Sequence, residues 1–499
     1  MPARKPKPGR GPGKSAVSAE ERALLSREAA GEKAPEDSPE GHLSPTPEYP
    51  LLELLERPPR LGPFRKVGNR IDLRGLSLEN LAALVAELKE KPFRATQLSK
   101  WIHRKAVTRF DEMTDISLST RGALSKLAHV DPAVRALEIH PSPDGAVRFL
   151  WGLRDELTVE SVVIAERDHQ TICVSTQVGC RMGCRFCRTA TLGFKRNLSQ
   201  SEILGQIIET KRLSKNPGSI TNVVLMGMGE PLDNLGAVLP SLEIITSGSG
   251  LSFSAKRISV STVGIIPSIE AIAKEEKKFN CGLTISLGAP DDSLRSSIMP
   301  ANRLFPLAEL KKTLQGFPLT RGRRLTIAYV LLAGVNDSPS QAAELSRFLT
   351  GLKTKINLIP FNPWPGAPYQ RPDEAAVEAF KRVLIDKNYT VIVRRSSGHK
   401  VGAACGQLVA RELGSPNEAL SGQGVLEPEF FWQDSSARKK GEQEKSAQEK
   451  GAQEKGEQDK GEQDKAQLKS QANSASPPSP GKASRQGNTI RRPSTRKPQ

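Results

Sequence analysis

Four of the six cysteines lie in one short stretch, "CVSTQVGCRMGCRFCRTATLGF", which begins at Cys173. Cys180, Cys184 and Cys187 have the spacing C-x-x-x-C-x-x-C, and Cys173 stands seven residues before them. A structural zinc site takes four ligands, commonly as two C-x-x-C pairs, and the nearby His169 is a weak fourth candidate. A [4Fe–4S] cluster held by three cysteines leaves one iron without a protein ligand. The spacing therefore favours an iron–sulfur cluster with one position open to a small molecule.

A second motif, "LMGMGEPLDN", combines glycines with a carboxylate. Gly227 and Gly229 allow the backbone to approach a ligand closely, and Glu230 could bind an ammonium group. Many strand-to-helix turns look like this, so the motif alone is weak. Of the two remaining thiols, Cys281 begins a predicted strand and is interpreted as a packing residue. Cys405, in "GAACGQLVA", would by itself be interpreted as a small core residue.

These residues need a scaffold, and from about residue 171 the sequence alternates strands with helices. Ser199 and Glu202 form a capping-box pattern before one helix, and Pro267 and Pro339 stand in the first turns of two others. A further helix covers residues 373–387. The expected strands are TICVSTQ, TNVVLMGMG, RISVSTVG, CGLTISLG, RLTIAYVLLAG, KINLIPFNP and a last TVIVRR. Six βα repeats predict an α/β fold with a parallel sheet wound into a partial (β/α)6 barrel, whose chemistry lies at the C-terminal ends of the strands.

The preceding segment, residues 66–145, predicts a small N-terminal helical accessory domain. Ser77 can cap a helix, and a second, basic helix covers residues 91–107. The outer lysines and arginines of that helix could meet RNA phosphates or form a solvated face. The apolar residues expected to face inward are Leu78, Leu81, Val85 and Leu88 in the first helix and Leu98, Trp101 and Ile102 in the second. Residues 146–165 predict a β-hairpin connector with a tight turn, and residues 166–413 form the predicted catalytic core.

The two ends differ in composition from this core. Residues 1–65 are rich in Pro, Gly, Ser and Glu, and residues 414–499 contain a pentapeptide array such as "GEQDK", so both are expected to be disordered or weakly structured. Residues 1–65 and 433–499 carry +1 and +6 of the net charge of +18, which leaves +11 for residues 66–432. This basic core suggests a polyanionic partner, with solubility as the alternative explanation. The sparse, clustered cysteines and the lack of a bilayer-length apolar run predict a cytoplasmic protein that does not enter membranes.

The three-cysteine loop after the first strand of such a barrel resembles the radical S-adenosylmethionine (SAM) superfamily. Phe186, directly before Cys187, is also usual there. The resemblance implies that the open iron binds SAM and that an electron from the cluster breaks the sulfonium bond, which yields a 5′-deoxyadenosyl radical. In the same superfamily the Gly-Glu-Pro motif contacts the amino group of SAM.

Six motifs together resemble the RlmN/Cfr family of radical SAM RNA adenine methyltransferases over roughly residues 70–413. They are "TICVSTQVGC", "GFKRNLS", "MGMGEPL", "ISVSTVGIIP", "IPFNPWPGAPY" and "AACGQL". The resemblance implies that Cys405 is methylated by one SAM, that a radical derived from a second SAM activates this methyl group, and that its carbon adds to adenine. Cys173 would then release the product and form a transient disulfide with Cys405, and Glu160 would accept the proton. The implied SAM contacts are Gly229, Glu230, Ser261, Ser286 and Asn362.

The implied activity is methylation of an sp² carbon of adenosine, at C2, in 23S rRNA and also tRNA. The expected partners are RNA and an electron donor such as flavodoxin, and we expect a monomer. A C8-methylating enzyme of the Cfr branch and a non-catalytic RNA-binding relative with a vestigial cluster stay open as alternatives. A radical SAM activase or methylthiotransferase is disfavoured, because neither needs the pair Cys173 and Cys405.

Two positions depart from the family pattern. The family usually has His in "SLHA", where this chain has Gly288, and Gly-x-Asp-Ile, where this chain has Gly398, His399, Lys400 and Val401. The departures leave the cysteines unchanged and indicate a divergent member. Lys400 keeps the C8 alternative open.

Overall fold

The computed structural model describes residues 66–67, 70–214, 216–275, 279–320, 322–394, 398 and 401–409, all of which belong to one compact unit, Pro59–Gln499. The tails predicted for residues 1–65 and 414–499, and the departures at His399 and Lys400, lie outside these residues. In the described part of the chain, no helix is long and apolar enough to cross a membrane.

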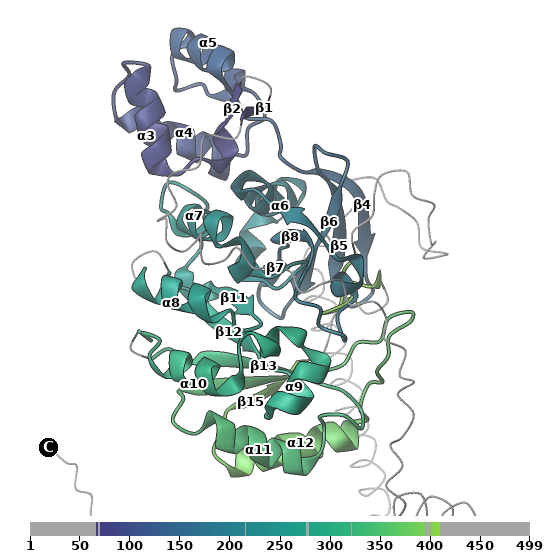
Figure 1. Ribbon diagram of the computed structural model, residues 1–499. Coiled ribbons are helices and arrows are strands. Elements are labelled where there is room, and N and C mark those ends of the chain that lie inside the picture. Colours follow the sequence, from purple (N-terminus) through teal and green to yellow (C-terminus); the bar gives the residue numbers. More distant parts are fainter. Residues whose placement is uncertain are drawn as a thin grey trace, which may run out of the picture. The chain divides into compact units, whose positions relative to one another are not determined.

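The N-terminal region is a small helical unit, coloured purple in Figure 1. Ser77 caps its first helix by accepting a hydrogen bond from the Asn80 amide at 3.2 Å, as the sequence predicts. Leu81 and Val85 are buried, whereas Leu78 is 36% exposed because it is the first residue of the helix and lies at the edge of the packed face. The elements are β1 (Lys66–Val67), β2 (Arg70–Asp72), η1 (Leu73–Gly75), α3 (Leu78–Glu87), α4 (Phe93–Ser99), η2 (Lys100–Arg104), η3 (Phe110–Glu112), α5 (Leu118–Leu127) and β3 (Ala128–His129).

The second predicted helix is divided into two parts. The regular helix α4 ends at Ser99, and the chain continues as the π-helical turn η2. Leu98, Trp101 and Ile102 are buried as expected, and the Trp101 indole nitrogen donates to the Asp115 carboxylate at 2.5 Å. The three residues are spaced i, i+3 and i+4, so they lie on one face of the helical segment and pack into the core of the N-terminal unit.

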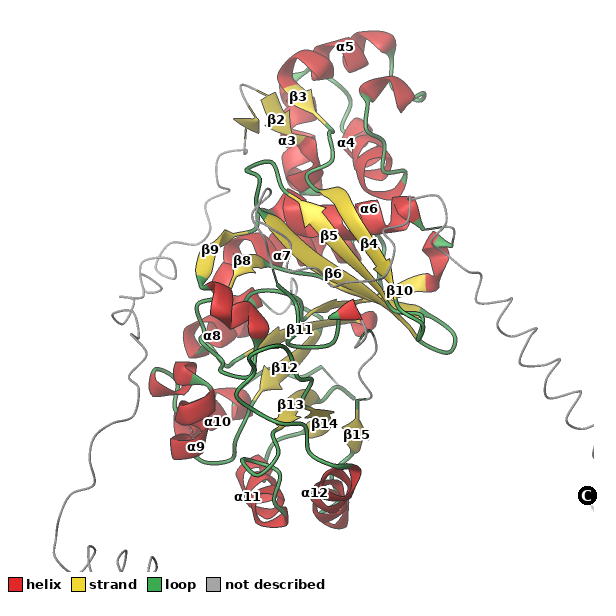
Figure 2. Ribbon diagram, turned by 90° about the vertical axis from the view of Figure 1, so that its right-hand side faces the viewer, coloured by secondary structure: helices red, strands yellow, loops and turns green. Residues whose placement is uncertain are grey.

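A ten-stranded mixed sheet forms the core, in the order β15-β14-β13-β12-β11-β10-β7-β6-β5-β4. Seven of its strands are parallel: β7 (Gln170–Cys173), β10 (Ile220–Leu225), β11 (Ile258–Thr262), β12 (Gly282–Ser286), β13 (Leu325–Leu331), β14 (Thr354–Pro360) and β15 (Val391–Val393). The expected hairpin over residues 147–164 is confirmed as β5 (Val147–Gly152) and β6 (Thr158–Ala165). It does not stand apart, because β6 pairs with β7 and β5 pairs with β4 (Arg135–Pro141), so these strands extend the core sheet (Figure 2).

Helices connect the parallel strands and pack against the sheet (Figure 1). The capping box of Ser199 and Glu202 is confirmed at α6, and Ser338 and Gln341 form another at α11. The sequence analysis did not resolve α7, α9 and α10 individually. The helices are α6 (Gln200–Leu213), α7 (Leu235–Thr246), α8 (Ile266–Lys274), α9 (Asp292–Ile298), α10 (Leu307–Gln315), α11 (Pro339–Leu349) and α12 (Glu374–Asp386), with short turns η4 (Arg188–Leu192), η5 (Pro217–Ser219), η6 (Pro231–Asn234), η7 (Ala255–Arg257) and η8 (Pro300–Arg303).

A buried ion pair joins the N-terminal unit to the core. The Arg74 guanidinium, in η1, is fully buried and donates to the Glu209 carboxylate of α6 at 2.8 Å. It also donates to the carbonyl oxygens of Val107 and Val130. On the next turn of α6, the Gln206 amide exchanges two hydrogen bonds with the backbone of Ser175, just after β7. Helix α6 therefore connects the accessory unit to the loop that leads to the cysteine motif.

Candidate active site

The three-cysteine loop is closed by a small antiparallel ribbon of β8 (Gln177–Gly179) and β9 (Phe194–Asn197). The Cys180 amide donates to the Gly193 carbonyl at 2.9 Å, and the Cys187 amide donates to the Cys184 carbonyl at 3.0 Å. Gly179 has φ +74°, and a Cβ there would lie 1.8 Å from the Gly193 carbonyl oxygen. Glycine is therefore required where the loop begins, because no side chain fits at this crossing.

The three thiols are electrostatic neighbours. Burial raises the pKa of Cys180, Cys184 and Cys187, and the charges of Cys184 and Cys187 raise the pKa of Cys180 further. Three buried thiolates are stable only when a positive group compensates them, which is what iron provides. In the described part of the chain no three ligating side chains converge on a single ion. Three thiols on one loop are the donor set that a [4Fe–4S] cluster takes when one of its irons has no protein ligand.

Glu230 is buried beside the cysteines, directly after β10. Its carboxylate accepts hydrogen bonds from the amides of Val263, at 2.8 Å, and Leu232, at 3.1 Å. Burial raises the pKa of Glu230 to about 7 despite these hydrogen bonds. An incoming ammonium group would favour the charged carboxylate, which agrees with the predicted contact to the SAM amino group.

The glycines before Glu230 allow two segments of the protein to pack closely against each other. Gly229 has φ +97°, and a Cβ there would lie 2.5 Å from the Cβ of Gln177, while a Cβ at Gly227 would lie 2.7 Å from the Val174 carbonyl oxygen. The sequence suggested close approach to a ligand, whereas the structure shows close approach to the segment that follows β7. The Glu230 amide donates to the Gln177 side chain at 2.8 Å, so this packing holds Glu230 in place.

The other predicted SAM contacts lie at the C-terminal ends of strands. Ser261 is the second-last residue of β11, and Ser286 is the last residue of β12. The hydroxyl oxygens of these two serines are 3.3 Å apart. Asn362 follows β14, is buried, and donates from its amide to the Cys405 carbonyl at 3.1 Å. Asn362 is thus shown in contact with the Cys405 loop, and its contact with SAM stays a prediction.

The Cys405 loop, residues 401–409, docks against the cysteine motif. The Arg188 amide donates to the Gly406 carbonyl at 2.8 Å, and the Thr189 hydroxyl donates to the Leu408 carbonyl at 2.8 Å. The Gln407 amide donates to the Pro363 carbonyl at 2.6 Å. The first two contacts join residues more than 200 positions apart and hold the Cys405 loop against the cluster loop, while the third holds it against the segment after β14.

The charge of Cys405 acts on the thiol of Cys173. Burial raises the pKa of the Cys173 thiol to about 12, and the charge of Cys405 contributes to this shift. Cys405 is exposed as a residue, yet the protein atoms around its thiol raise the pKa by desolvation, and the charge of Cys187 adds to the effect. Both are free thiols, as are the other four cysteines. The accessible thiol of Cys405 is therefore within electrostatic range of the buried thiol of Cys173.

Glu160 completes this group from β6 and is fully buried. One of its carboxylate oxygens forms an ion pair with Arg148 of β5, and the other accepts from the Val409 amide at 3.0 Å. Arg148 lies opposite Val162, which lies opposite Cys173, so these residues form one row across the sheet. Residues in one row share a face, and Glu160 joins them because it is two positions from Val162. Glu160 is therefore a buried residue of the site and not a glutamate at the exposed edge of a strand.

Sequence reasoning missed Arg148. A signal exists, because it is the one charged residue in the strand "VRFLWG", all six residues of which are buried. A charge at such a position needs a buried partner. Its Nε and Nη2 atoms are buried without a hydrogen-bond partner, so Glu160 holds its guanidinium through one nitrogen.

The departure at Gly288 has a local structural reason. Gly288 has φ +76°, and a Cβ there would lie 2.4 Å from the Sδ of Met299, which is fully buried. Met299 thus occupies the space that a side chain at position 288 would need.

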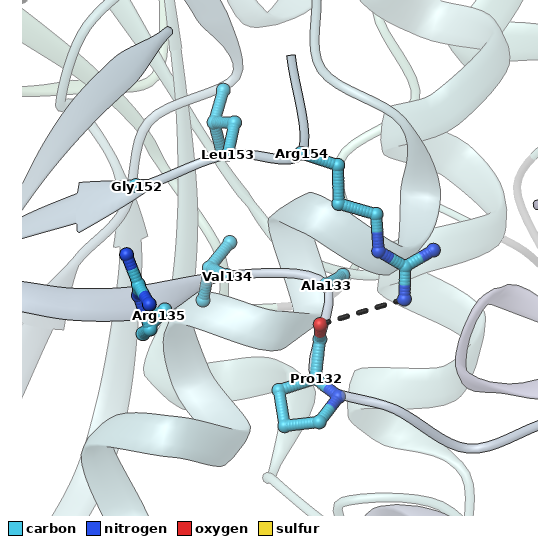
Figure 3. Close-up of a pocket in the computed structure, with 7 residues that line it drawn as sticks. All are labelled: Pro132, Ala133, Val134, Arg135, Gly152, Leu153 and Arg154. Carbon is cyan, nitrogen blue, oxygen red and sulfur yellow. Dashed lines mark hydrogen bonds between the residues drawn. The ribbon is translucent and has the colours of Figure 1, made fainter. Parts of the chain in front are cut away.

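Two other features lie away from this site. Cys281 is buried as expected for a packing residue, and burial raises its pKa to about 12. A cavity of about 180 Å³ lies where the chain enters the sheet, lined by Pro132, Ala133, Val134, Arg135, Gly152, Leu153 and Arg154. Figure 3 shows Arg154 reaching the Pro132 carbonyl across it. The lining contains no thiol, carboxylate or hydroxyl side chain, so we assign no chemistry to it.

Comparisons with known proteins identify the family. A family model described as the ribosomal RNA large subunit methyltransferase N-terminal domain matches residues 71–130, and the radical SAM superfamily model matches residues 174–345. The dual-specificity RNA methyltransferase RlmN of Anaeromyxobacter dehalogenans is 42% identical over 353 residues, which cover 70% of this chain and 93% of that protein. This chain belongs to the RlmN family of radical SAM RNA methyltransferases. The protein of the same name from Syntrophus aciditrophicus is 43% identical over 345 residues, with 69% and 98% covered.

A solved structure of the same kind agrees. The radical SAM methyltransferase from Sphaerobacter thermophilus matches with a TM-score of 0.64 at 37% identity, covering 68% of this chain and 98% of that one. The predicted radical SAM α/β fold is therefore confirmed. RlmN family members use a [4Fe–4S] cluster and SAM, which confirms the predicted cofactors. In this chain Cys180, Cys184 and Cys187 are the residues that fit the cluster.

Proposed function

We propose that this chain methylates C2 of an adenosine in 23S rRNA and in tRNA, with Cys405 as the carrier of the incoming carbon. The ribosomal RNA domain model and the name "dual-specificity RNA methyltransferase" of the relatives support these two RNA classes. The observation that carries the proposal is the docking of the Cys405 loop between the cluster loop, Asn362 and Glu160. An enzyme that transferred a methyl group directly from SAM would have no use for this arrangement.

The chemistry of the substrate explains the need for two thiols. C2 of adenine is electron-poor, so the electrophilic methyl group of SAM does not attack it in a polar reaction, whereas a carbon radical adds to it. The cluster, when bound, supplies the electron that starts radical formation from SAM. The Cys405 sulfur accepts the methyl group as its thiol proton leaves, and then holds the carbon while it adds to the base.

The remaining steps belong to Glu160 and Cys173. Glu160 accepts the proton from the ring carbon, and the Arg148 guanidinium keeps its carboxylate charged and oriented. The Cys173 thiolate then attacks the Cys405 sulfur, so that a disulfide forms while the bond from sulfur to the product carbon breaks and this carbon takes up a proton. The unpaired electron of the adduct must leave as well, and the cluster, when bound, would be its acceptor. A thiol reductant restores both thiols before the next turnover.

We assign the remaining partners by the same reasoning. The N-terminal unit, residues 66–145, presents exposed basic residues and serves as the RNA-binding accessory domain, with Lys100, Arg104 and Lys105 as candidate phosphate contacts. A low-potential donor such as flavodoxin supplies one electron to the cluster. The chain works as a monomer in the cytoplasm.

Nucleoside mass spectrometry of RNA treated with the anaerobically reconstituted protein tests the proposal. 2-Methyladenosine is expected, whereas 8-methyladenosine would assign the enzyme to the Cfr type, and no product would favour a vestigial cluster. Cys173→Ala should accumulate a covalent protein–RNA adduct at Cys405. Cys281→Ala is the matched control, because it removes a buried thiol at the N-terminal end of β12, the opposite end of the strand from the predicted SAM contact Ser286, and should turn over normally. Clean turnover by Cys173→Ala would exclude the two-thiol scheme.

A further inference from the structure

Arg295 of α9 is a fully buried cation. Its Nε donates to the Leu287 carbonyl at 2.8 Å, and its Nη2 donates to the Val263 carbonyl at 2.5 Å. Its Nη1 donates to the Asn302 side chain at 2.6 Å and to the Phe305 carbonyl at 3.2 Å. All four partners are neutral oxygen atoms. Among the residues that the structure describes, no carboxylate lies within ion-pair distance of this guanidinium.

A buried charge without a counter-charge costs several kcal/mol, so its presence calls for a compensating group. The buried Arg74 and Arg148 show the usual solution in this protein, because each has a buried glutamate as its partner. Arg295 differs from both. Asp292 is the carboxylate that acts on it electrostatically, but its side chain accepts hydrogen bonds from Asn302 and the Leu307 amide instead.

The position of Arg295 identifies what faces it. The helix that carries it ends against the cluster loop, where the Arg185 amide donates to the Ile298 carbonyl at 2.9 Å. On the same side, Gly183 packs toward Pro300, with 3.5 Å between an added Cβ and the proline ring. Cys184 stands between Gly183 and Arg185 in the chain, so α9 and the start of η8 pack against the part of the loop that carries this thiol. The missing counter-charge is therefore on the side of the cluster thiolates.

We propose that Arg295 is the counter-charge of the iron–sulfur cluster and raises its reduction potential. Three thiolates outweigh the positive charge of the oxidised core, and one further negative charge arrives on reduction. A fixed cation stabilises the reduced form more than the oxidised form, because the attraction grows with the charge of the cluster. The proposal rests on the cofactor of the family and not on the adenosine position that is methylated.

The four hydrogen bonds explain why an arginine suits this task. They connect the ends of β11 and β12 with η8 and the turn that follows it, so the guanidinium cannot swing toward solvent when the cluster changes charge. Arginine also stays charged in a buried site where lysine loses its proton more readily. Arg295 thus acts as a fixed electrostatic element in the wall of the site.

Redox titration of the reconstituted protein without RNA, followed by the electron paramagnetic resonance signal of the reduced cluster, tests the proposal. In Arg295→Gln the ratio of reduced to oxidised cluster at a fixed potential should fall about tenfold, which is ~59 mV for a one-electron couple. Arg295→Lys keeps the charge and should stay within about threefold of the wild type. Arg303→Gln is the matched control, because Arg303 is exposed at the end of η8 and its charge is screened.

Iron content and circular dichroism separate this role from a purely structural one. An Arg295→Gln protein with full iron content and the wild-type potential would overturn the proposal, as would an Arg295→Lys protein with a potential as low as that of Arg295→Gln. If Arg295→Gln folds but holds no iron while Arg295→Lys holds it, the charge is required by the cluster and the proposal stands. If both folded variants lose iron, the hydrogen-bonding shape of arginine is what the site needs, and the proposal fails.

Discussion

Glu160→Gln is predicted to destabilise the protein through Arg148. The Arg148 side chain is 3% exposed and that of Glu160 is 0% exposed, and two of the guanidinium nitrogens already lack partners. Neutralising the carboxylate leaves a buried cation with no counter-charge. Removal of one partner of a buried ion pair costs about 3–5 kcal/mol of unfolding free energy. The glutamine keeps an oxygen that can accept from the Val409 amide, so we expect the lower half of this range.

Urea denaturation of four proteins measures the effect: the wild type, Glu160→Gln, Arg148→Met and the double variant. In the double variant neither charge is present, so its loss should be at least about 2 kcal/mol smaller than the sum of the two single losses. Glu378→Gln is the matched control, because Glu378 pairs with Lys381 on the surface of α12 and is 64% exposed. This exposed pair should contribute less than about 1 kcal/mol.

Activity separates stability from chemistry in the same set. The double variant should fold and hold iron, yet it should accumulate the protein–RNA adduct because it has no carboxylate to accept the proton. Two results would refute this reasoning. The first is a Glu160→Gln protein whose urea midpoint equals that of Glu378→Gln. The second is a double variant that methylates RNA at the wild-type rate.

Three further predictions concern single positions. Gly229→Ala adds a Cβ 2.5 Å from Gln177 at φ +97°, so it should cost about 2–4 kcal/mol and weaken SAM binding at least tenfold, measured by equilibrium dialysis. The pKa of His103 is lowered by burial to about 4 from 6.5, so its contribution to stability is complete above pH 6.5 and is lost as the pH falls to 4. The fall in unfolding free energy between pH 7.5 and pH 4 should be about 3 kcal/mol smaller in His103→Gln than in the wild type. Gly288→Ala should cost about 2–4 kcal/mol in the wild type but only about 1 kcal/mol in a Met299→Ala background, where the clash is absent.

Each of these has a result that contradicts it. Wild-type SAM affinity in Gly229→Ala would mean that the segment after β7 moves without disturbing Glu230. Identical pH profiles for the wild type and His103→Gln would mean that the pKa of this imidazole is the same in the folded and unfolded states. An equal cost of Gly288→Ala in both backgrounds would show that the positive φ, and not Met299, restricts this position.

The local elements could be predicted from the sequence because short-range patterns determine them. Ser77, Ser199 and Glu202 cap helices at the expected places, since a cap depends on residues within one turn. The strand over residues 135–141 was assigned to the accessory region, although it pairs with β5 in the core sheet. Whether a strand belongs to one sheet or another depends on partners that its own residues do not identify.

In the candidate site, too, one part follows from local sequence and another part depends on residues far apart in the chain. The spacing of Cys180, Cys184 and Cys187 predicts a cluster with an open iron, because three ligands in one loop bind metal wherever that loop is placed. The partnership of Cys173 with Cys405 came from family resemblance and not from spacing, since 231 residues separate them. The structure places their charges within reach of each other because the Cys405 loop docks on the cluster loop.

The sequence by itself determined the chemistry that this protein carries: three cluster thiols, two further thiols, and a carboxylate after the second parallel strand. Only the tertiary structure decided which groups stand around that chemistry. Strand register places Arg148 in the row of Cys173, and the packing of α9 against the cluster loop places Arg295 in the wall of the site. A charged residue inside an apolar strand can signal a buried cation, as at Arg148, but the sequence does not show which groups lie beside such cations. Their partners follow from the order of the strands and from the packing of helices against them, which a linear pattern does not contain.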